Sequence, residues 1–507
     1  MSIISLLFFI FVLASAALYY ILPLKFRWLV LLAASLVFFI WGCGLARFPI
    51  FVAMVLVAWG AALLITKSSR KNMVLGLAIG LLALTLIIFK ENAFFINNTG
   101  KIVRAFGGSF DVKPPSWVAP LGISYYTLAL ISYLTDVAWG ISEAQKNPLK
   151  LLLFAGFFPQ MTSGPITRYR QISARLFEGN RFDSRNIAFG AQRVLWGLFK
   201  KLVIADRLAV LVSTLYGETG SATSYDGVYV WIAAAAYCFL VYTDFGGCMD
   251  IVIGVAQVFG VPLPENFTTP FYATSIAEFW RNWHITLGLW LKDYIMYPVL
   301  KSSWMGKIRK AGSKKLSKKA AKEIPTYIGM FMTWSLIGFW HGGDWKLIFG
   351  AGLFFFMIIA GGMLLKPVFE WMIRILHINT NTRGWIWWGR LRTALLFIVA
   401  GSFQRASSLK GGFKMWSKAF TWNPWVLFDG SLTGLGLDVK DLWVLVFTFV
   451  LLVIVSMRQR IEPVRKTISR QNIAWRWALW LLLLSAIVLF GMYGEGYNPQ
   501  DFIYGNY

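Results

Sequence analysis

Long apolar runs are the feature that most constrains the fold of this 507-residue chain. A helix that crosses the ~30 Å hydrocarbon core of a bilayer needs about 20 mostly apolar residues. The clear runs are Ile3–Leu24, Phe48–Thr66, Val74–Phe89, Trp231–Phe259, Leu347–Leu365, Leu442–Ser456 and Ala474–Tyr493, and the weaker ones are Trp28–Trp41, Ala119–Trp139, Ala188–Tyr216, Ile324–Trp340 and Leu391–Phe403. The sequence therefore predicts an all-α polytopic membrane protein with roughly a dozen transmembrane, re-entrant and interfacial helices.

The net charge of +26 lies mainly in the loops between these runs. Only 14% of the residues are charged, against about 25% in a typical soluble protein. Basic clusters at 67–71, 168–175, 301–322 and 458–470 contain few acidic residues. Loops of this kind stay on the cytoplasmic side and favour anionic lipid, so membrane lipids are the expected partner and nucleic acid is not.

The same rule predicts that both termini are extracytoplasmic, including the tail 494–507. No Lys or Arg precedes the first apolar run, which continues without a break to Leu24. We therefore expect a retained helix there and not a cleaved signal peptide. No linker is long enough to separate soluble domains, so a single integral-membrane domain over residues 1–507 is predicted.

The three cysteines show no paired spacing, and no His-Glu-x-x-His motif occurs, so neither a disulfide framework nor a metal site is expected. The segment Lys301–Lys322 contains nine Lys or Arg and no acid. Two interpretations of it stay open. It is a solvated cytoplasmic loop against lipid phosphates, or it is a docking surface for an acidic donor such as an acyl carrier protein or the phosphates of coenzyme A.

Ionisable side chains interrupt the apolar stretches in four places, and such residues usually face a bundle interior or an aqueous cavity. They are Asp136, then Asp244 and Asp250, then the segment 278–294 with Glu278, Arg281, His284, Lys292 and Asp293, and finally His341 and Asp344. On a continuous helix, Trp280, His284 and Leu287 share one face, and we expect an interfacial or re-entrant helix. In the plainer alternative, Glu278 pairs with Arg281 and His284 is only a hydrogen-bonded helix residue.

The stretch "FWHGGDW" at 339–345 follows a long apolar run. Its two glycines are expected to end or thin the helix just after His341 and to allow close approach of a backbone or substrate. A neutral imidazole can accept a proton from a hydroxyl and later return it. Proton transfer is therefore the chemistry that this stretch favours.

Three stretches resemble the membrane-bound O-acyltransferase (MBOAT) family, and in particular its bacterial branch that acts on alginate and teichoic acid. They are "FFPQMTSGPITRYRQI" at 157–172, the near-continuous pattern from "YTDFGGCMD" to "LKDYIMYPV" at 242–299, and "GFWHGGDWKLIFGAGL" at 338–353. Their order and spacing support the resemblance, which covers about 120–355 with gaps.

The resemblance implies a ring of helices around a central passage, with His341 catalytic and His284 supporting it. It implies a cytosolic acyl thioester as co-substrate, either acetyl-CoA or an acyl carrier protein, with no tightly bound cofactor and no metal. It also implies an extracytoplasmic polysaccharide as acceptor, a partner acyltransferase, and a location in the bacterial plasma membrane. The residues expected to line the passage are Trp280, Arg281, Asp293, Asp244, Asn266 and Trp340.

The ending "DFIYGNY" resembles the Phe-x-Tyr ending of some bacterial members, although Gly505, Asn506 and Tyr507 depart from it. By that resemblance Tyr504 is an acyl relay; otherwise it is an interfacial anchor, as tyrosines commonly are. The leading hypothesis is O-acylation, most simply O-acetylation, of a secreted polysaccharide. The alternatives are D-alanyl transfer to teichoic acid, a polysaccharide or lipid transporter, and an acyltransferase-like scaffold without activity.

Overall fold

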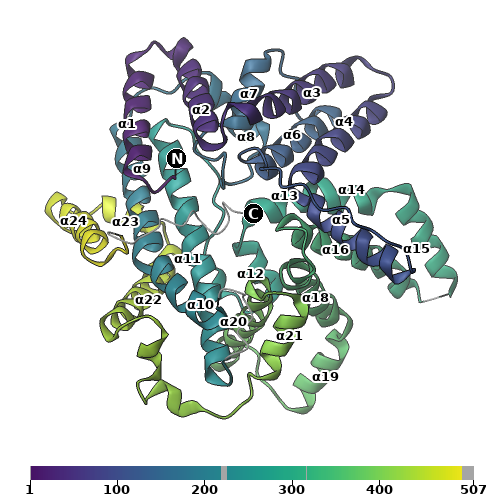
Figure 1. The fold of residues 1–507 in the computed structure, drawn as a ribbon, viewed down its shortest axis with the longest axis vertical. Helices are drawn as coiled ribbons and strands as arrows, with labels where there is room; N and C mark the ends of the chain where they lie inside the picture. The colour runs from purple at the N-terminus through teal and green to yellow at the C-terminus, as the bar shows by residue number, and fades with distance from the viewer. Residues whose placement is uncertain (1, 218–224, 316, 494–507) are drawn as a thin grey trace. The chain divides into compact units, whose positions relative to one another are not determined.

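The computed structural model describes residues 2–217, 225–315 and 317–493, and Figure 1 labels its helices. The described chain divides into two compact units. The first contains residues 2–198 and 247–265, and the second contains residues 199–246 and 266–493. The single domain expected over residues 1–507 stays a prediction.

The described secondary-structure elements of the first unit are all helical, and α3 packs against α4, α6 and α7. Its short turns are η1 (Leu24–Phe26) and η2 (Leu45–Arg47), and a π-helical turn η3 (Ile87–Glu91) joins α4 to α5. The α-helices are α1 (Leu6–Ile21), α2 (Arg27–Cys43), α3 (Phe48–Lys67), α4 (Lys71–Leu86), α5 (Asn92–Ala105), α6 (Ile123–Ala138), α7 (Pro148–Gly156), α8 (Tyr169–Phe177) and α9 (Ser184–Leu198).

The second unit carries the two histidine stretches. Its α-helices are α10 (Asp206–Tyr216), α12 (Ile276–Asn282), α13 (Ile285–Leu291), α14 (Tyr297–Lys301), α15 (Ser303–Lys315), α16 (Lys318–Trp340), α17 (Trp345–Leu347), α18 (Phe354–Leu364), α19 (Lys366–Ile375), α20 (Arg383–Arg405), α21 (Leu409–Ser417), α22 (Val439–Gln459), α23 (Val464–Ser469) and α24 (Ile473–Phe490). Its π-helical turns are η4 (Phe199–Ala205), η6 (Lys292–Met296) and η7 (Ile348–Leu353), and its 3₁₀ turns are η5 (Pro270–Tyr272), η8 (Pro424–Leu427) and η9 (Ser431–Leu435). The helix α11 (Val228–Val258) begins in this unit and ends in the first.

The prediction of an all-α polytopic membrane protein is confirmed. Each of the twelve predicted apolar runs overlaps one or more helical elements, and no β-strand occurs in the described part of the chain. Seven helical segments are long and apolar enough to cross a membrane. They are Leu24–Cys43, Leu45–Lys67, Lys71–Ala105, Val228–Val258, Trp345–Leu364, Val439–Gln459 and Ile473–Phe490.

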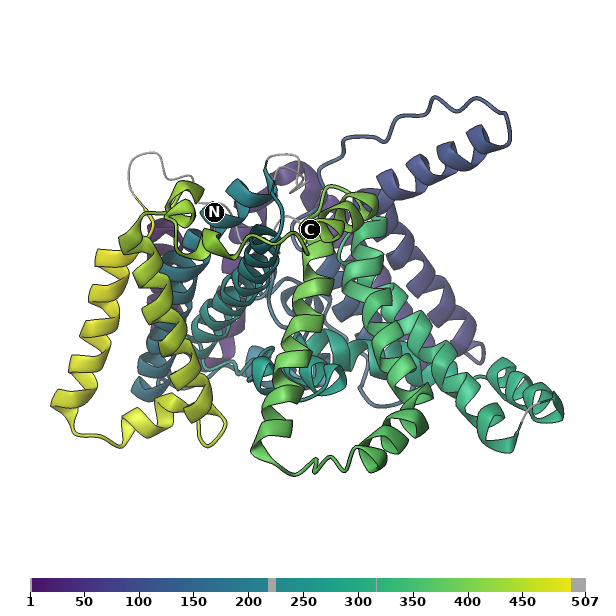
Figure 2. The ribbon, with the colours of Figure 1, turned by 90° about the horizontal axis from the view of Figure 1, so that it is seen from below.

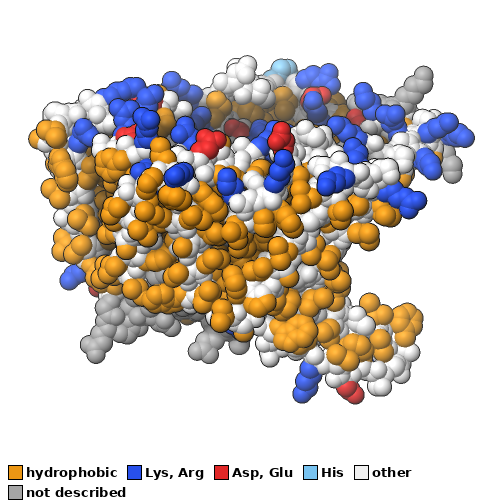
Figure 3. Space-filling model, turned by 90° about the horizontal axis from the view of Figure 1, so that it is seen from above, with side chains coloured by type: hydrophobic (Ala, Val, Ile, Leu, Met, Phe, Trp, Pro, Cys, Tyr) orange, Lys and Arg blue, Asp and Glu red, His pale blue; other side chains and the backbone are white. Residues whose placement is uncertain are grey.

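These candidate spans differ widely in how much of them the protein covers. In α11, 83% of the apolar 18-residue stretch is buried inside the protein, whereas in α24 only 6% is. Leu482 and Leu489 on α24 are 71% and 73% exposed. Hydrophobic side chains cover much of the surface seen in Figure 3, and Lys and Arg are largely separate from them. Exposed apolar surface of this extent matches helices that face lipid.

The interpretation of Lys301–Lys322 as a loop is wrong. Most of this segment is helical: α15 occupies Ser303–Lys315, and α16 begins at Lys318 and packs against α15 (Figure 2). Lysine, arginine and alanine are strong helix formers, so charge density alone does not prevent a helix. Met305 and Ala321 are buried, which gives the helix pair an apolar contact face.

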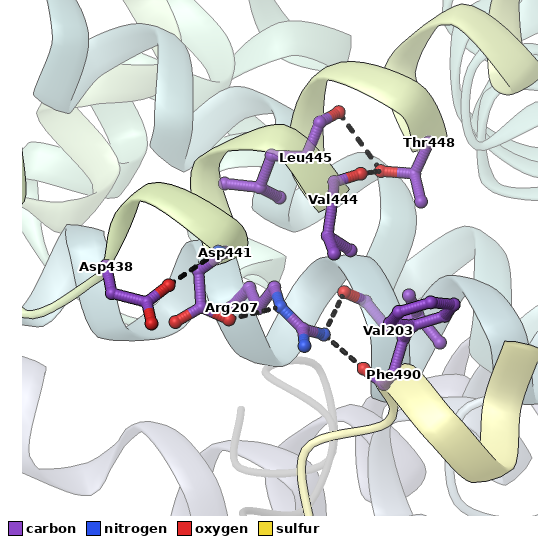
Figure 4. Close-up of polar contacts among 8 residues, drawn as sticks. All are labelled: Val203, Arg207, Asp438, Asp441, Val444, Leu445, Thr448 and Phe490. Atoms are coloured by element: carbon purple, nitrogen blue, oxygen red, sulfur yellow. Dashed lines mark hydrogen bonds and ion pairs between the residues drawn. The ribbon is translucent and has the colours of Figure 1, made fainter.

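One buried arginine joins three helices of the second unit (Figure 4). Arg207 on α10 donates from Nε to Asp441 Oδ1 of α22 over 2.9 Å, and from Nη1 to Val203 O over 3.0 Å. Its Nη1 also donates to the carbonyl of Phe490, the last residue of α24. Beside this contact, Asp438 caps the start of α22 by accepting a hydrogen bond from the amide of Asp441. Arg207 therefore holds the ends of α22 and α24 to α10.

Replacing Arg207 by Met removes the guanidinium and leaves Asp441 and the Phe490 carbonyl without this donor. We expect the Arg207→Met substitution to destabilise the protein by about 2 kcal/mol. This is less than a fully buried pair would lose, because Asp441 is 29% exposed. The measurement is the thermal unfolding midpoint of the full chain in detergent.

The control is Lys366→Met, which breaks an exposed pair with Glu370 in which the side chains are 71% and 59% exposed. Exposed pairs contribute little, so this midpoint should stay near that of the unchanged protein. Equal midpoints for both variants would contradict the role assigned to Arg207.

Candidate active site

His284 lies in a break between two short helices of the second unit. The helix α12 ends at Asn282 and α13 begins at Ile285. Between them His284 adopts φ 44° and ψ 50°, in the left-handed region that non-glycine residues rarely occupy. The continuous helix expected for 278–294 is therefore wrong, and Trp280, His284 and Leu287 do not share the face of one helix.

A short antiparallel pairing holds this break in place. Phe267 and Trp283 form an isolated β-bridge. The amide of Thr268 donates to Asn282 O over 3.1 Å, and the amide of Ile285 donates to Asn266 O over 3.0 Å. These bonds satisfy backbone groups that a continuous helix would have satisfied internally, which explains why the helix is interrupted here.

The side chain of Asn266 lies against His284. Asn266 Oδ1 is 3.2 Å from His284 Nδ1, 2.9 Å from Thr286 Oγ1 and 3.1 Å from the Thr286 amide nitrogen. Asn266 is 0% exposed and His284 is 1% exposed. The sequence named Asn266 as a passage residue, but its contact with His284 was not predicted.

His341 follows directly after the end of α16. Its amide donates to Ile337 O over 3.2 Å, and the next residue, Gly342, has φ 136°. Asp344 then caps α17 by accepting from the amide of Lys346 over 2.9 Å. The prediction that the glycines end the helix just after His341 is confirmed, because α16 ends at Trp340.

Two other glycines fix the position of the end of α16. The helix packs against η7, and a Cβ on Gly338 would lie 2.5 Å from Ile348 Cα. A Cβ on Gly352 would overlap with the carbonyl oxygen of Trp334. Only glycine permits backbones to approach this closely. The contact determines where His341, three residues after Gly338, is held.

The structure brings the two histidines together. Their ring centroids are 6.1 Å apart, and the Trp340 ring lies 5.8 Å from His284 and 5.1 Å from His341. Phe245 of α11 closes another side of His284 at 4.9 Å. His341 is 5% exposed. Such a pair of enclosed imidazoles can exchange protons with a bound hydroxyl while excluding water.

His284 lies outside the seven candidate spans. Burial, and secondarily its neighbour His341, hold the pKa of the His284 imidazole well below its usual range. The ring is therefore neutral at neutral pH and has a lone pair for accepting a proton.

The remaining residues of the segment 278–294 lie in different environments. Trp280 packs against Trp334 and Phe355, both with centroids 5.0 Å away. Arg281 is exposed. Glu278 Oε2 accepts from the amide and hydroxyl of Thr274 over 2.8 and 2.9 Å, and no ion pair with Arg281 occurs among the described residues. The alternative in which Glu278 pairs with Arg281 is therefore wrong. Asp293 lies in the π-helical turn η6 and is partly buried.

The intramembrane aspartates of α11 form ion pairs. Asp244 is 0% exposed and lies 2.8 Å from Lys201 Nζ, which also contacts Asp206 at 3.0 Å. In the first unit, Asp250 accepts from Arg193 over 2.9 Å. Sequence reasoning missed both cations, although their positions in the apolar run Ala188–Tyr216 were a usable signal. That Asp244 lines a passage stays a prediction, as does the lining role of Trp280, Arg281, Asp293, Asn266 and Trp340.

Tyr504, the candidate acyl relay, lies outside the described residues. Among the residues that the structure does describe, no cluster of three or more His, Cys, Asp or Glu side chains is arranged to hold a metal ion.

The close contact between Gly338 and the backbone of η7 can be tested by substitution. We expect Gly338→Ala to displace the end of α16, because the new methyl group would meet backbone and not a movable side chain. Overpacking of this kind costs about 1–3 kcal/mol. The measurements are the unfolding midpoint and acyl transfer, and both should fall.

The matched control on the same helix is Gly329→Ala, whose methyl group would meet side chains and no backbone: Leu300 at 3.4 Å and Met296 at 3.8 Å. It should be neutral or slightly stabilising, because alanine is the better helix former. If Gly338→Ala behaves like Gly329→Ala, the close backbone contact does not position His341.

Comparison with known proteins gives the family. Residues 145–398, just over half of the 507, match the membrane-bound O-acyltransferase family. The chain is 30% identical to the probable alginate O-acetylase AlgI of Pseudomonas aeruginosa, over 87% of this chain and 79% of that protein.

Two further relatives carry different activities. The chain is 31% identical to the peptidoglycan O-acetyltransferase of Helicobacter pylori, over 63% of this chain and 61% of that protein. It is 28% identical to the teichoic acid D-alanyltransferase of Bacillus subtilis, over 45% of this chain and 55% of that protein. All three names describe acyl transfer, which supports an O-acyltransferase over the transporter and the inactive scaffold. The chain belongs to the membrane-bound O-acyltransferase family and is an O-acyltransferase.

Proposed function

We propose that the protein transfers an acetyl group from a cytosolic thioester to hydroxyl groups of an extracytoplasmic polysaccharide. The observation that carries this proposal is the buried pair His284–His341, whose rings lie 6.1 Å apart beside the glycine-terminated end of α16. An imidazole held in such a site matches general-base catalysis on a hydroxyl.

The acetyl group is favoured by the extent of the similarity. Identity hardly separates the relatives, at 30%, 31% and 28%. The share of this chain that aligns does separate them: the alginate O-acetylase aligns with 87% of it and the teichoic acid D-alanyltransferase with 45%. The names of the two O-acetylating relatives, with alginate and peptidoglycan, also favour a polysaccharide acceptor. D-alanyl transfer to teichoic acid is the second candidate.

The proposed reaction gives His341 the role of general base. Its imidazole takes the proton of the acceptor hydroxyl as the oxygen attacks the thioester carbonyl. The C–S bond then breaks, and the departing thiolate takes the proton back from the imidazolium. One ester and one thiol are formed from one hydroxyl and one thioester. His284 supports His341, and general-base catalysis of this kind contributes about 10²–10⁴-fold.

The wider setting follows from the same proposal. Acetyl-CoA or an acyl carrier protein supplies the acyl group from the cytosol, and no tightly bound cofactor is needed. In this proposal Trp280, Arg281 and Trp340 help to line the passage between donor and acceptor, and Trp340 packs against both histidines. The protein sits in the bacterial plasma membrane among its lipids, with both termini extracytoplasmic, and works with a partner acyltransferase on the far side.

His341→Asn tests the proposal. In cells that carry this variant at normal expression, we expect ester-bound acetate on the surface polymer to fall by about 10²-fold or more, because asparagine cannot act as the base. The amount of exported polymer should not change. Ester-bound acetate is measured after mild alkaline release, and polymer by its sugar content.

The control is His377→Asn, which replaces an exposed histidine at φ 51°, a conformation that asparagine tolerates. It should keep full acetylation. Undiminished acetate in the His341→Asn cells would refute the base role. Loss of the polymer itself would point to export and not to acyl transfer, and release of D-alanine in place of acetate would establish the second candidate.

Tyr504→Phe separates direct transfer from a relay. The substitution removes only the phenolic oxygen that would carry the acyl group. If the tyrosine is an interfacial anchor, ester-bound acetate stays at its normal level, since phenylalanine also partitions to the membrane. A loss as large as that of His341→Asn would establish the relay. Protein abundance in the membrane is measured alongside.

A further inference from the structure

The three contacts of Asn266 Oδ1 determine which atoms of the His284 ring carry hydrogen. The backbone amide of Thr286 can only donate, and its nitrogen lies 3.1 Å from this atom of Asn266. The atom must therefore be the carbonyl oxygen and not the amide nitrogen, which fixes the orientation of the side chain. The Thr286 hydroxyl, at 2.9 Å, donates to the same oxygen.

His284 Nδ1 lies 3.2 Å from that oxygen. Two lone pairs facing each other would repel, so Nδ1 must carry the hydrogen and donate. In a neutral imidazole the other nitrogen then has no hydrogen and accepts. We infer that Asn266 is a positioning residue that holds neutral His284 in the Nδ1-protonated tautomer, so that Nε2 is the nitrogen of this ring that can accept a proton.

The enclosure of the contact strengthens this inference. Asn266 is 0% exposed, His284 is 1% exposed and Thr286 is 4% exposed, so water does not compete for the oxygen. The backbone of Asn266 is itself tied to the segment it orients, through the bond from the Ile285 amide to Asn266 O. The left-handed backbone of His284 and the tautomer of its ring are thus set by one residue.

The tautomer has a chemical consequence. When Nε2 accepts a proton, Nδ1 keeps its hydrogen and its bond to Asn266, so the ring does not have to turn. The amide oxygen stabilises the cation only as a dipole, whereas a carboxylate there would stabilise it as a full charge. Asparagine therefore orients the ring and leaves it neutral at rest.

The charged and titratable groups on the described elements around His284 have contacts of their own. The ring of His341, directly after α16, faces His284, and Phe245 of α11 faces it from another side. Asp244, next to Phe245, is paired with Lys201. On α12, Glu278 accepts from Thr274. On η6, Lys292 lies over the Tyr297 ring, and Asp293 is partly buried.

The tautomer is measured directly and without any assay of activity. The chain has only three histidines, so ¹⁵N-histidine labelling of the full-length protein in lipid bilayers gives a simple NMR spectrum. His377→Asn and His341→Asn assign the signals. At neutral pH, His284 should show a protonated Nδ1 and an unprotonated Nε2. A protonated Nε2, or exchange between the two forms, would overturn the inference.

Asn266→Asp tests the positioning role. Both carboxylate oxygens can still accept from Nδ1 and from Thr286, so the fold and the tautomer should survive. The added charge raises the pKa of His284, so the ring becomes protonated at a higher pH. Acyl transfer from acetyl-CoA in isolated membranes should then lose activity at a higher pH, with the acidic limb of its profile moved upward by about one pH unit.

Two variants complete the design. Asn379→Asp makes the same substitution on an exposed loop residue and should leave the pH profile unchanged. Thr286→Val removes the hydroxyl but keeps the backbone amide, so the NMR tautomer of His284 should not change. An unmoved acidic limb in Asn266→Asp would overturn the positioning role.

The pH profile rests on the proposed function, and the NMR result does not. Suppose that neither wild-type nor variant membranes transfer acetyl groups, but the spectrum shows the Nδ1-protonated form. The proposed acetyl transfer then fails, and the inferred tautomer stands. If transfer is normal while the spectrum shows the other tautomer, the inference fails and the proposed function stands.

Discussion

Backbone amides that lie away from water must find partners within the protein, and this requirement governs the segment that carries His284. The helix breaks between Asn282 and Ile285, and the strand-like segment at Asn266–Thr268 supplies the missing partners. The same segment supplies the side-chain oxygen that meets the His284 ring. The break and the orientation of the imidazole are therefore consequences of one pairing.

The second histidine depends on a different constraint, the close approach of α16 to η7. Glycines at 338 and 352 let these backbones touch, and α16 ends immediately before His341. Two imidazoles thus meet from separate elements: His341 is placed by the backbone contact of α16 with η7, and His284 by backbone pairing and the buried side chain of Asn266. A site built in this way needs little reorganisation as charge develops, which is where most catalytic stabilisation arises. Acyl transfer between a thioester and a hydroxyl fits such a site.

The sequence predicted most of the fold, because apolar runs of helical length are a direct consequence of the bilayer. It also predicted that His341 ends a helix, from the glycines that follow. It did not predict the break at His284, because helical periodicity assumes an unbroken helix and the pairing with Phe267 is long-range. The partners Lys201 and Arg193 were missed because their ion pairs with Asp244 and Asp250 are also long-range. Lys301–Lys322 was interpreted as a loop because its charge was given more weight than its helix propensity.

The central claim is that acyl transfer from the thioester to the hydroxyl takes place at the site formed by His284 and His341. An electron cryomicroscopy map of the full-length protein with an acetyl-CoA analogue, in which a methylene group replaces the thioester sulfur, tests this most directly. The account predicts that the analogue's carbonyl lies within hydrogen-bonding reach of the His341 imidazole, beside His284. A well-defined analogue whose carbonyl lies away from both rings would contradict it.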